Sequence, residues 1–132
     1  MYSLKKDNFE IKKNYNRVLI VIKTKFNSIE LKFLVKNLFQ QKGFDDIQVI
    51  LLVDKNFTLD NELSELKNLQ IIVNNSDENS VHIIKKNIIG NEFLILVNND
   101  IFPVTNHTFF DLCTICKSEP EIGLVSCREI LT

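Results

Sequence analysis

One apolar stretch, FLILVNND over residues 93–100, ends abruptly in two amides and an acid. Asn98 and Asp100 carry oxygen atoms of the kind that Mg²⁺ or Mn²⁺ prefers, so a site for a cation and a phosphate is one interpretation. A simple turn after a strand is the other interpretation, because Asn and Asp favour turns. Which of the two holds depends on the elements that position these residues.

Strand-like and helix-like segments alternate along the chain. Five apolar runs predict strands, most of them buried on both faces, and the four segments between them have helical spacing of apolar residues. This alternation predicts an α/β domain with a mostly parallel sheet of about five strands, flanked by helices on right-handed crossovers. The predicted strands are residues 17–24, 47–54, 69–75, 93–100 and 122–130, and the predicted helices are residues 27–43, 58–69, 78–90 and 105–120.

The predicted helices also carry signals for their ends and inner faces. Asn27 or Ser28 can cap the first helix, and Gly43 can end it. Thr108 and Asp111 are spaced like a capping box at the start of the last helix. The residues expected on inner faces are Leu31, Leu34, Val35 and Leu38; Leu59, Leu63 and Leu66; and Val81, Ile84 and Ile88.

Length and composition indicate one domain. The chain has 132 residues, which we divide into a polar lead-in, residues 1–16, and a single domain, residues 17–132. The net charge is −1, which gives no general attraction to nucleic acid or to an anionic membrane. No apolar run reaches the ~20 residues of a membrane span, and the first residues lack the apolar core of a signal peptide. We therefore expect a cytoplasmic protein.

The strand ends resemble those of a known family. The segments VIKTKFNS, ILLVDKN and LVNNDIF, followed by EIGLVSC, occur in the order and spacing found in the N-terminal half of family 2 glycosyltransferases of GT-A type. The resemblance covers residues 17–130, and the joint order of the segments carries it. It implies a Rossmann-like domain that binds a nucleotide-diphosphate sugar for transfer to an acceptor, such as a glycan or a lipid-linked saccharide.

The resemblance implies roles for four residues. Asp54 matches the acid that hydrogen-bonds the nucleotide base, and Thr24 lies in the loop that lines the base pocket. Asn98 matches the first position of the acidic motif, near the ribose, and Asp100 matches its last position, which holds Mg²⁺ or Mn²⁺ on the donor diphosphate. Such a cation neutralises charge that develops on the leaving group. The catalytic base stays unassigned, because in this family it lies beyond the region of resemblance.

Two other functions are compatible with the same pattern. The first is a non-catalytic binding or interaction module on this fold, in which an exposed sheet edge pairs with another chain, for example as a homo-oligomer. The second is a receiver-like domain that is phosphorylated on Asp54. The second function is disfavoured, because the end of the first strand, KTKFN, offers no acid to hold Mg²⁺.

The cysteines and histidines have simpler interpretations. Three cysteines argue against a disulfide framework. Cys113 and Cys116 fall inside a predicted helix on its apolar stripe, whereas a redox pair usually lies at a helix start, so we expect them to pack in the core. His82 is expected in solvent, and His107 in the loop before the last helix.

Overall fold

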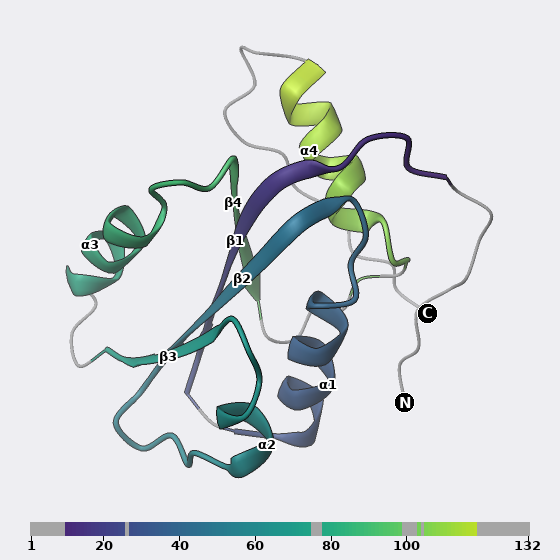
Figure 1. The fold of residues 1–132 in the computed structure, drawn as a ribbon. Coiled ribbons are helices and arrows are strands. Elements are labelled where there is room, and N and C mark those ends of the chain that lie inside the picture. The colour runs from purple at the N-terminus through teal and green to yellow at the C-terminus, as the bar shows by residue number, and fades with distance from the viewer. Residues whose placement is uncertain (1–9, 26, 75–77, 99–102, 104, 119–132) are drawn as a thin grey trace.

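A computed structural model describes residues 10–25, 27–74, 78–98, 103 and 105–118, and these residues form an α/β arrangement (Figure 1). Four strands make one all-parallel sheet with helices on both faces, as the alternation predicts. The predicted fifth strand, residues 122–130, lies outside the described residues. The elements are β1 (Tyr15–Thr24), α1 (Ile29–Leu38), β2 (Phe44–Val53), α2 (Asn61–Ser64), β3 (Leu69–Val73), α3 (Glu78–Asn87), β4 (Phe93–Asn98) and α4 (Thr108–Ser118).

The order of strands in the sheet is β3-β2-β1-β4. Ile20 in β1 pairs with Val49 in β2 and with Ile95 in β4, so β1 lies between β2 and β4. After β1 the chain passes to one side to form β2, and after β3 it crosses back over the sheet to form β4. The order in which strands are added to the sheet therefore reverses between β1 and β4.

One face of the sheet is covered by α1, α2 and α4. Because side chains alternate along a strand, every second residue of β1 points to this face. Val18, Ile20 and Ile22 are fully buried here. The helix residues that pack on them and on β2 are Leu31, Leu34, Val35 and Leu38 from α1, Leu63 from α2, and Phe109 and Cys113 from α4.

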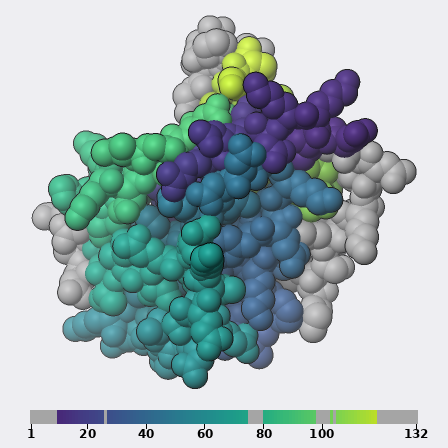
Figure 2. All heavy atoms as spheres, in the orientation of Figure 1, coloured from purple at the N-terminus to yellow at the C-terminus, as the bar shows by residue number. Residues whose placement is uncertain are grey.

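The opposite face is covered by α3, as Figure 1 shows, and the green part of the chain that contains α3 forms the upper left of the surface in Figure 2. Leu19 and Val21 of β1 and Ile50 and Leu52 of β2 are buried on this face, against Ile83, Ile84 and Ile88 of the α3 region. Among the described strands, β4 lies at the end of the sheet and is covered less completely, since Leu96 is 66% exposed.

The first helix begins as predicted but ends early. The Ser28 hydroxyl oxygen accepts the backbone N–H of Leu31, which makes Ser28 the N-cap. The C-cap is Phe39, so Gly43 does not end the helix as predicted. After the helix, the buried Gln41 side chain donates to the Thr105 carbonyl and accepts the N–H of Phe109. These bonds hold the chain against the start of α4 and take residues 39–43 out of the helix.

The second helix is a single turn rather than the predicted residues 58–69. Its N-cap is Asp60, whose carboxylate accepts the N–H of Leu63. Leu59 therefore lies outside the helix and is 58% exposed, so the prediction that it faces the core was wrong. The helix ends soon because Asn68 adopts a φ of +65° and its carbonyl accepts the N–H of Val49, where β3 begins to pair with β2.

The third helix is rotated relative to its predicted face. Ile84 and Ile88 contact the sheet as predicted, but Val81 is 59% exposed and Ile83 takes its place on the inner side. The position of the N-terminal end of α3 is set by the Asn74 amide, which donates to the Ser80 hydroxyl over 2.6 Å. The sequence pattern does not distinguish the two orientations, because residues 81 and 83 are both apolar.

The last helix starts at Thr108, directly after His107, whose carbonyl accepts the first hydrogen bond of the helix. The N–H of Asp111 donates this bond, so Thr108 is the first helical residue and not the predicted cap. The His107 ring nitrogen Nδ1 lies 2.7 Å from the Asp111 carboxylate. Cys113 packs in the core as predicted, whereas Cys116 is only partly buried, so the prediction of core packing holds for Cys113 alone. His82 is exposed as predicted.

Candidate functional site

The carboxyl ends of β2, β1 and β4 bring three of the four predicted site residues to one edge of the sheet. Thr24 pairs with Val53, so Asp54, which follows Val53, lies just beyond it. The neighbouring residue Lys23 pairs with Asn98 of β4. The backbone of Asn98 thus lies beside the end of β1, while the fourth residue, Asp100, falls outside the described residues.

The strand order also reverses between two of these strands, β1 and β4. Open parallel sheets bind ligands beyond the carboxyl ends of the strands, at the point where the strand order reverses. In this chain the order reverses between β1, which is followed by α1 on one face, and β4, which is reached through α3 on the opposite face (Figure 1). The topology therefore places the candidate site between the end of β1 and the end of β4, with Asp54 on the adjoining strand.

Asp54 is half-buried and occupies a turn. Its carboxylate accepts the backbone N–H of Asn56 over 3.3 Å, and its carbonyl accepts the N–H of Phe57 over 3.0 Å. The first of these bonds is long for an N–H···O contact. A carboxylate can accept about four hydrogen bonds, so the turn uses a small part of the capacity of Asp54. Both the turn interpretation and a ligand contact are compatible with this geometry.

Thr24 and Lys23 point to opposite faces of the sheet. Thr24 is 5% exposed on the face that α1 covers, and Lys23 is exposed on the face that α3 covers. Because Thr24 is buried, its side chain lies beneath the edge rather than on its surface. Lys23, which also lies among the residues at the predicted strand ends, is the residue of this pair that brings a positive charge to the edge.

A polar cluster next to this edge was missed from the sequence. The Asn27 amide nitrogen donates to the Thr58 carbonyl over 2.9 Å and to the Asp60 carboxylate over 2.8 Å. Lys32 Nζ lies 2.6 Å from the same carboxylate oxygen. The cluster ties the loop after β1 to the loop after β2. Within the described part of the chain, the side-chain oxygen of Asn27 is buried and has no hydrogen-bond partner.

The charges in this cluster are matched. The hydrogen bond from Lys32, with further bonds from the Leu63 N–H and the Asn27 amide, lowers the pKa of Asp60 from its ordinary 3.8 to about 2. The same bond to Asp60 raises the pKa of Lys32. Asp60 therefore stays ionised and paired near neutral pH, which makes it a structural anchor for the two loops rather than a proton acceptor. The signal for its capping role was the sequence DNEL, an acid three residues before a buried leucine.

A preformed metal centre is not seen in the described part of the chain, where no three His, Cys, Asp or Glu side chains cluster closely enough to hold an ion. A cation at the predicted position would have Asp100 as its protein ligand and would take its remaining ligands from diphosphate and water, as Mg²⁺ commonly does. Among the described helices, none has the length and apolar character required to cross a membrane.

In comparisons with known proteins, no family model, no curated protein and no solved structure matches this chain. The case for a function is therefore built from the sequence pattern and from the position of the strand ends.

Proposed function

We propose that this chain is the donor-binding part of a glycosyltransferase, a Rossmann-like domain of GT-A type that works in the cytoplasm. It binds a nucleotide-diphosphate sugar with Mg²⁺ or Mn²⁺, for transfer of the sugar to a glycan or lipid-linked saccharide. One observation carries the proposal. The strand order β3-β2-β1-β4 brings Thr24, Asp54 and the backbone of Asn98 to adjoining strand ends, at the edge where such sheets bind ligands.

The proposed roles follow from the chemistry of each group. The Asp54 carboxylate accepts hydrogen bonds from N–H groups of the base, since an ionised carboxylate is an acceptor only. Asn98 lies near the ribose, and Thr24 supports the base pocket from below. The cation, when bound by Asp100 and the diphosphate, neutralises the charge of the leaving group. Lys23 adds positive charge at the same edge.

The test is isothermal titration of the purified chain with UDP, GDP and dTDP, each with and without Mn²⁺. We expect one nucleotide to bind in a metal-dependent manner. Asp100→Ala should abolish the metal-dependent binding, and Asp54→Ala should weaken binding whether or not metal is present, because its proposed partner is the base. Asp45→Ala is the matched control, since Asp45 is an exposed acid at the opposite end of β2.

Two results would count against this proposal. A folded chain that binds none of the three nucleotides has no donor site. An Asp54→Ala variant that loses affinity only in the presence of metal would remove Asp54 from the base pocket, and so would a loss equal to that of Asp45→Ala.

The alternative is a non-catalytic module that pairs with a second copy of itself through a sheet edge. The exposure of Leu96 favours it, because β4 is an edge strand among the described strands and Leu96 on it is 66% exposed. Light scattering of the purified chain distinguishes the two functions. A dimer that Leu96→Lys converts to a monomer, in a chain without nucleotide affinity, supports the module.

A further inference from the structure

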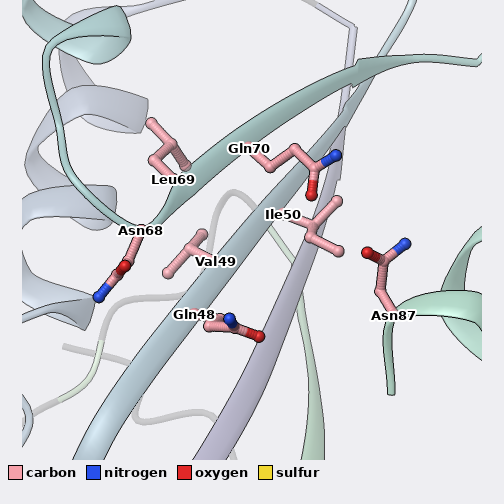
Figure 3. Close-up of a pocket in the computed structure, with 7 residues that line it drawn as sticks. All are labelled: Gln48, Val49, Ile50, Asn68, Leu69, Gln70 and Asn87. Carbon is pink, nitrogen blue, oxygen red and sulfur yellow. The ribbon is translucent and has the colours of Figure 1, made fainter. Parts of the chain in front are cut away.

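A cavity of about 160 Å³ lies on the α3 face of the sheet, away from the candidate donor site (Figure 3). Gln48 in β2 lines it, and Val53 ends the same strand. At about 3.3 Å per residue, the lining residues Ile50 and Gln48 lie roughly 10 and 17 Å from the carboxyl end of β2. A ligand in this cavity is therefore separate from one bound beyond the strand ends.

Carboxamide side chains surround the cavity. Figure 3 shows Gln48, Ile50 and Gln70 on the strands and Asn87 reaching towards them from the end of α3. The three strand residues share one face of the sheet. Gln70 pairs with Ile50 on the neighbouring strand, and Gln48 lies two residues before Ile50 in the same strand. The same face is apolar further along the strands, where Leu52 and Val21 are buried. The amides thus form a polar region in an otherwise apolar layer.

The amides are only partly satisfied by the protein. Asn91 donates to the Gln48 side-chain oxygen over 3.4 Å and to the Asn87 backbone carbonyl over 3.1 Å. The Asn91 side-chain oxygen is buried and, in the described part of the chain, has no partner. Asn91 is not one of the residues that line the cavity; it contacts two of them, Gln48 and Asn87, and so supports their positions. The Asn87 amide nitrogen is already used by the protein, since it donates to the Ile83 carbonyl over 2.8 Å.

The cavity carries no net charge. Its lining contains no ionisable side chain. The acid that touches the lining is Asp46, which accepts a bond from Asn68 over 3.1 Å and is paired with Arg17 over 3.1 Å. A phosphate or carboxylate ligand would find no counter-charge in the lining. The lining also lacks an aromatic ring on which a nucleobase could stack.

We propose that this amide pocket, formed by Gln48, Ile50, Gln70, Asn87 and the supporting Asn91, binds one neutral sugar ring. A carboxamide both donates and accepts hydrogen bonds, as a sugar hydroxyl does, so the two are matched group for group. Pockets for drug-sized ligands have volumes of roughly 300–1,000 Å³, so a cavity of about half the lower figure suits a ligand no larger than a single ring. The pocket stands independently of the proposed donor site, and its ligand is recognised without metal or charge.

The test is a ¹H–¹⁵N NMR titration that follows the side-chain NH₂ signals of Gln48, Gln70 and Asn87. The probes are D-glucose and N-acetyl-D-glucosamine, with adenine and glucose 6-phosphate as comparisons. We expect saturable shifts of these signals with a neutral sugar, at a dissociation constant on the order of 1 mM for so small a ligand. Gln48→Leu should abolish the shifts of Asn87, and the exposed Gln40→Leu should leave them unchanged.

Several outcomes would overturn the proposal. The absence of shifts at about 50 mM of either sugar, far above a 1 mM dissociation constant, would mean that the wild-type pocket binds no sugar. Stronger shifts with adenine or with glucose 6-phosphate would refute a neutral sugar site. If Gln48→Leu does not fold, Asn87→Ala replaces it, and unchanged sugar shifts of Gln48 in that variant refute the site. Nucleotide affinity should be the same in Gln48→Leu and wild type, which separates this pocket from the donor site.

Discussion

Gly43 is the residue at which backbone conformation and packing combine most clearly. It lies directly before β2 with a φ of +105°, and its carbonyl accepts the N–H of Tyr15 over 2.7 Å. A Cβ added there would clash with the ring of Phe110 in α4, at 2.7 Å from Cγ, and would lie 2.8 Å from Cβ. Rotation of the ring about χ1 moves the ring but leaves Phe110 Cβ in place, so the side chain alone cannot relieve the clash.

Gly43→Ala should therefore lower the free energy of unfolding for two reasons, one in the backbone and one in the packing. Holding an alanine at positive φ costs about 1–2 kcal/mol. Overpacking against Phe110 adds about 1–3 kcal/mol. The expected loss in free energy of unfolding is the sum, about 2–5 kcal/mol, which is a large part of the ~5–15 kcal/mol typical of a domain. Gly90 is the matched control, because its φ is +86° but an added Cβ would meet only Arg17 Nη1, at 3.6 Å.

The assay is urea denaturation followed by circular dichroism, which yields the free energy of unfolding of each variant. Gly90→Ala should lose about 1–2 kcal/mol, the backbone cost alone. Gly43→Ala should lose more, and the excess should shrink in a Phe110→Ala background, where the ring is gone. Equal losses at the two glycines, or an excess that Phe110→Ala leaves unchanged, would refute the packing of α4 on this turn.

Three further predictions concern the core, the loop cluster and the thiols. Leu34→Ala, at a position 1% exposed, should lower the free energy of unfolding in urea by about 2–5 kcal/mol. Val81→Ala, at a position 59% exposed, should lower it by under about 0.5 kcal/mol. A loss at Val81 similar to that at Leu34 would contradict the exposure of this face of α3. Because the folded pKa of Asp60 is about 2, below its ordinary 3.8, its ion pair with Lys32 stabilises the fold above pH 4 and is lost as the pH falls towards 2. Asp60→Asn, which keeps a capping side chain, should flatten the thermal stability profile in that window, and a profile identical to wild type would exclude the pair. Burial raises the pKa of Cys113 to about 12, so iodoacetamide should label it, by mass spectrometry, only when urea unfolds the chain; labelling under native conditions would contradict its place in the core.

The sequence alone predicts much of the fold for identifiable reasons. Residues 18–22 and 49–53 are apolar throughout, a pattern typical of strands covered on both faces, which predicts a parallel sheet between layers of helices. Ser28 was likewise readable as a helix cap, because capping depends on residues three positions apart. The candidate residues Thr24, Asp54 and Asn98 were found by their position at strand ends.

Other features depended on contacts between distant parts of the chain. The first helix ends early because Gln41 bonds Thr105 and Phe109, more than 60 residues away, and no local signal encodes those partners. The second helix is short because β3 must begin at residue 69 to pair with β2. The cluster of Asn27, Lys32 and Asp60 and the amide pocket each join residues from different elements and loops of the fold.

The sequence by itself determined the types of the elements, because burial on both faces and helical spacing are local patterns. It also predicted the carboxyl ends of the described strands to within two residues. Only the tertiary structure decided that β1 lies between β2 and β4, since that pairing joins residues such as Lys23 and Asn98 across most of the chain. The position of the candidate site follows from this order, because strand ends form one edge only when their strands are neighbours.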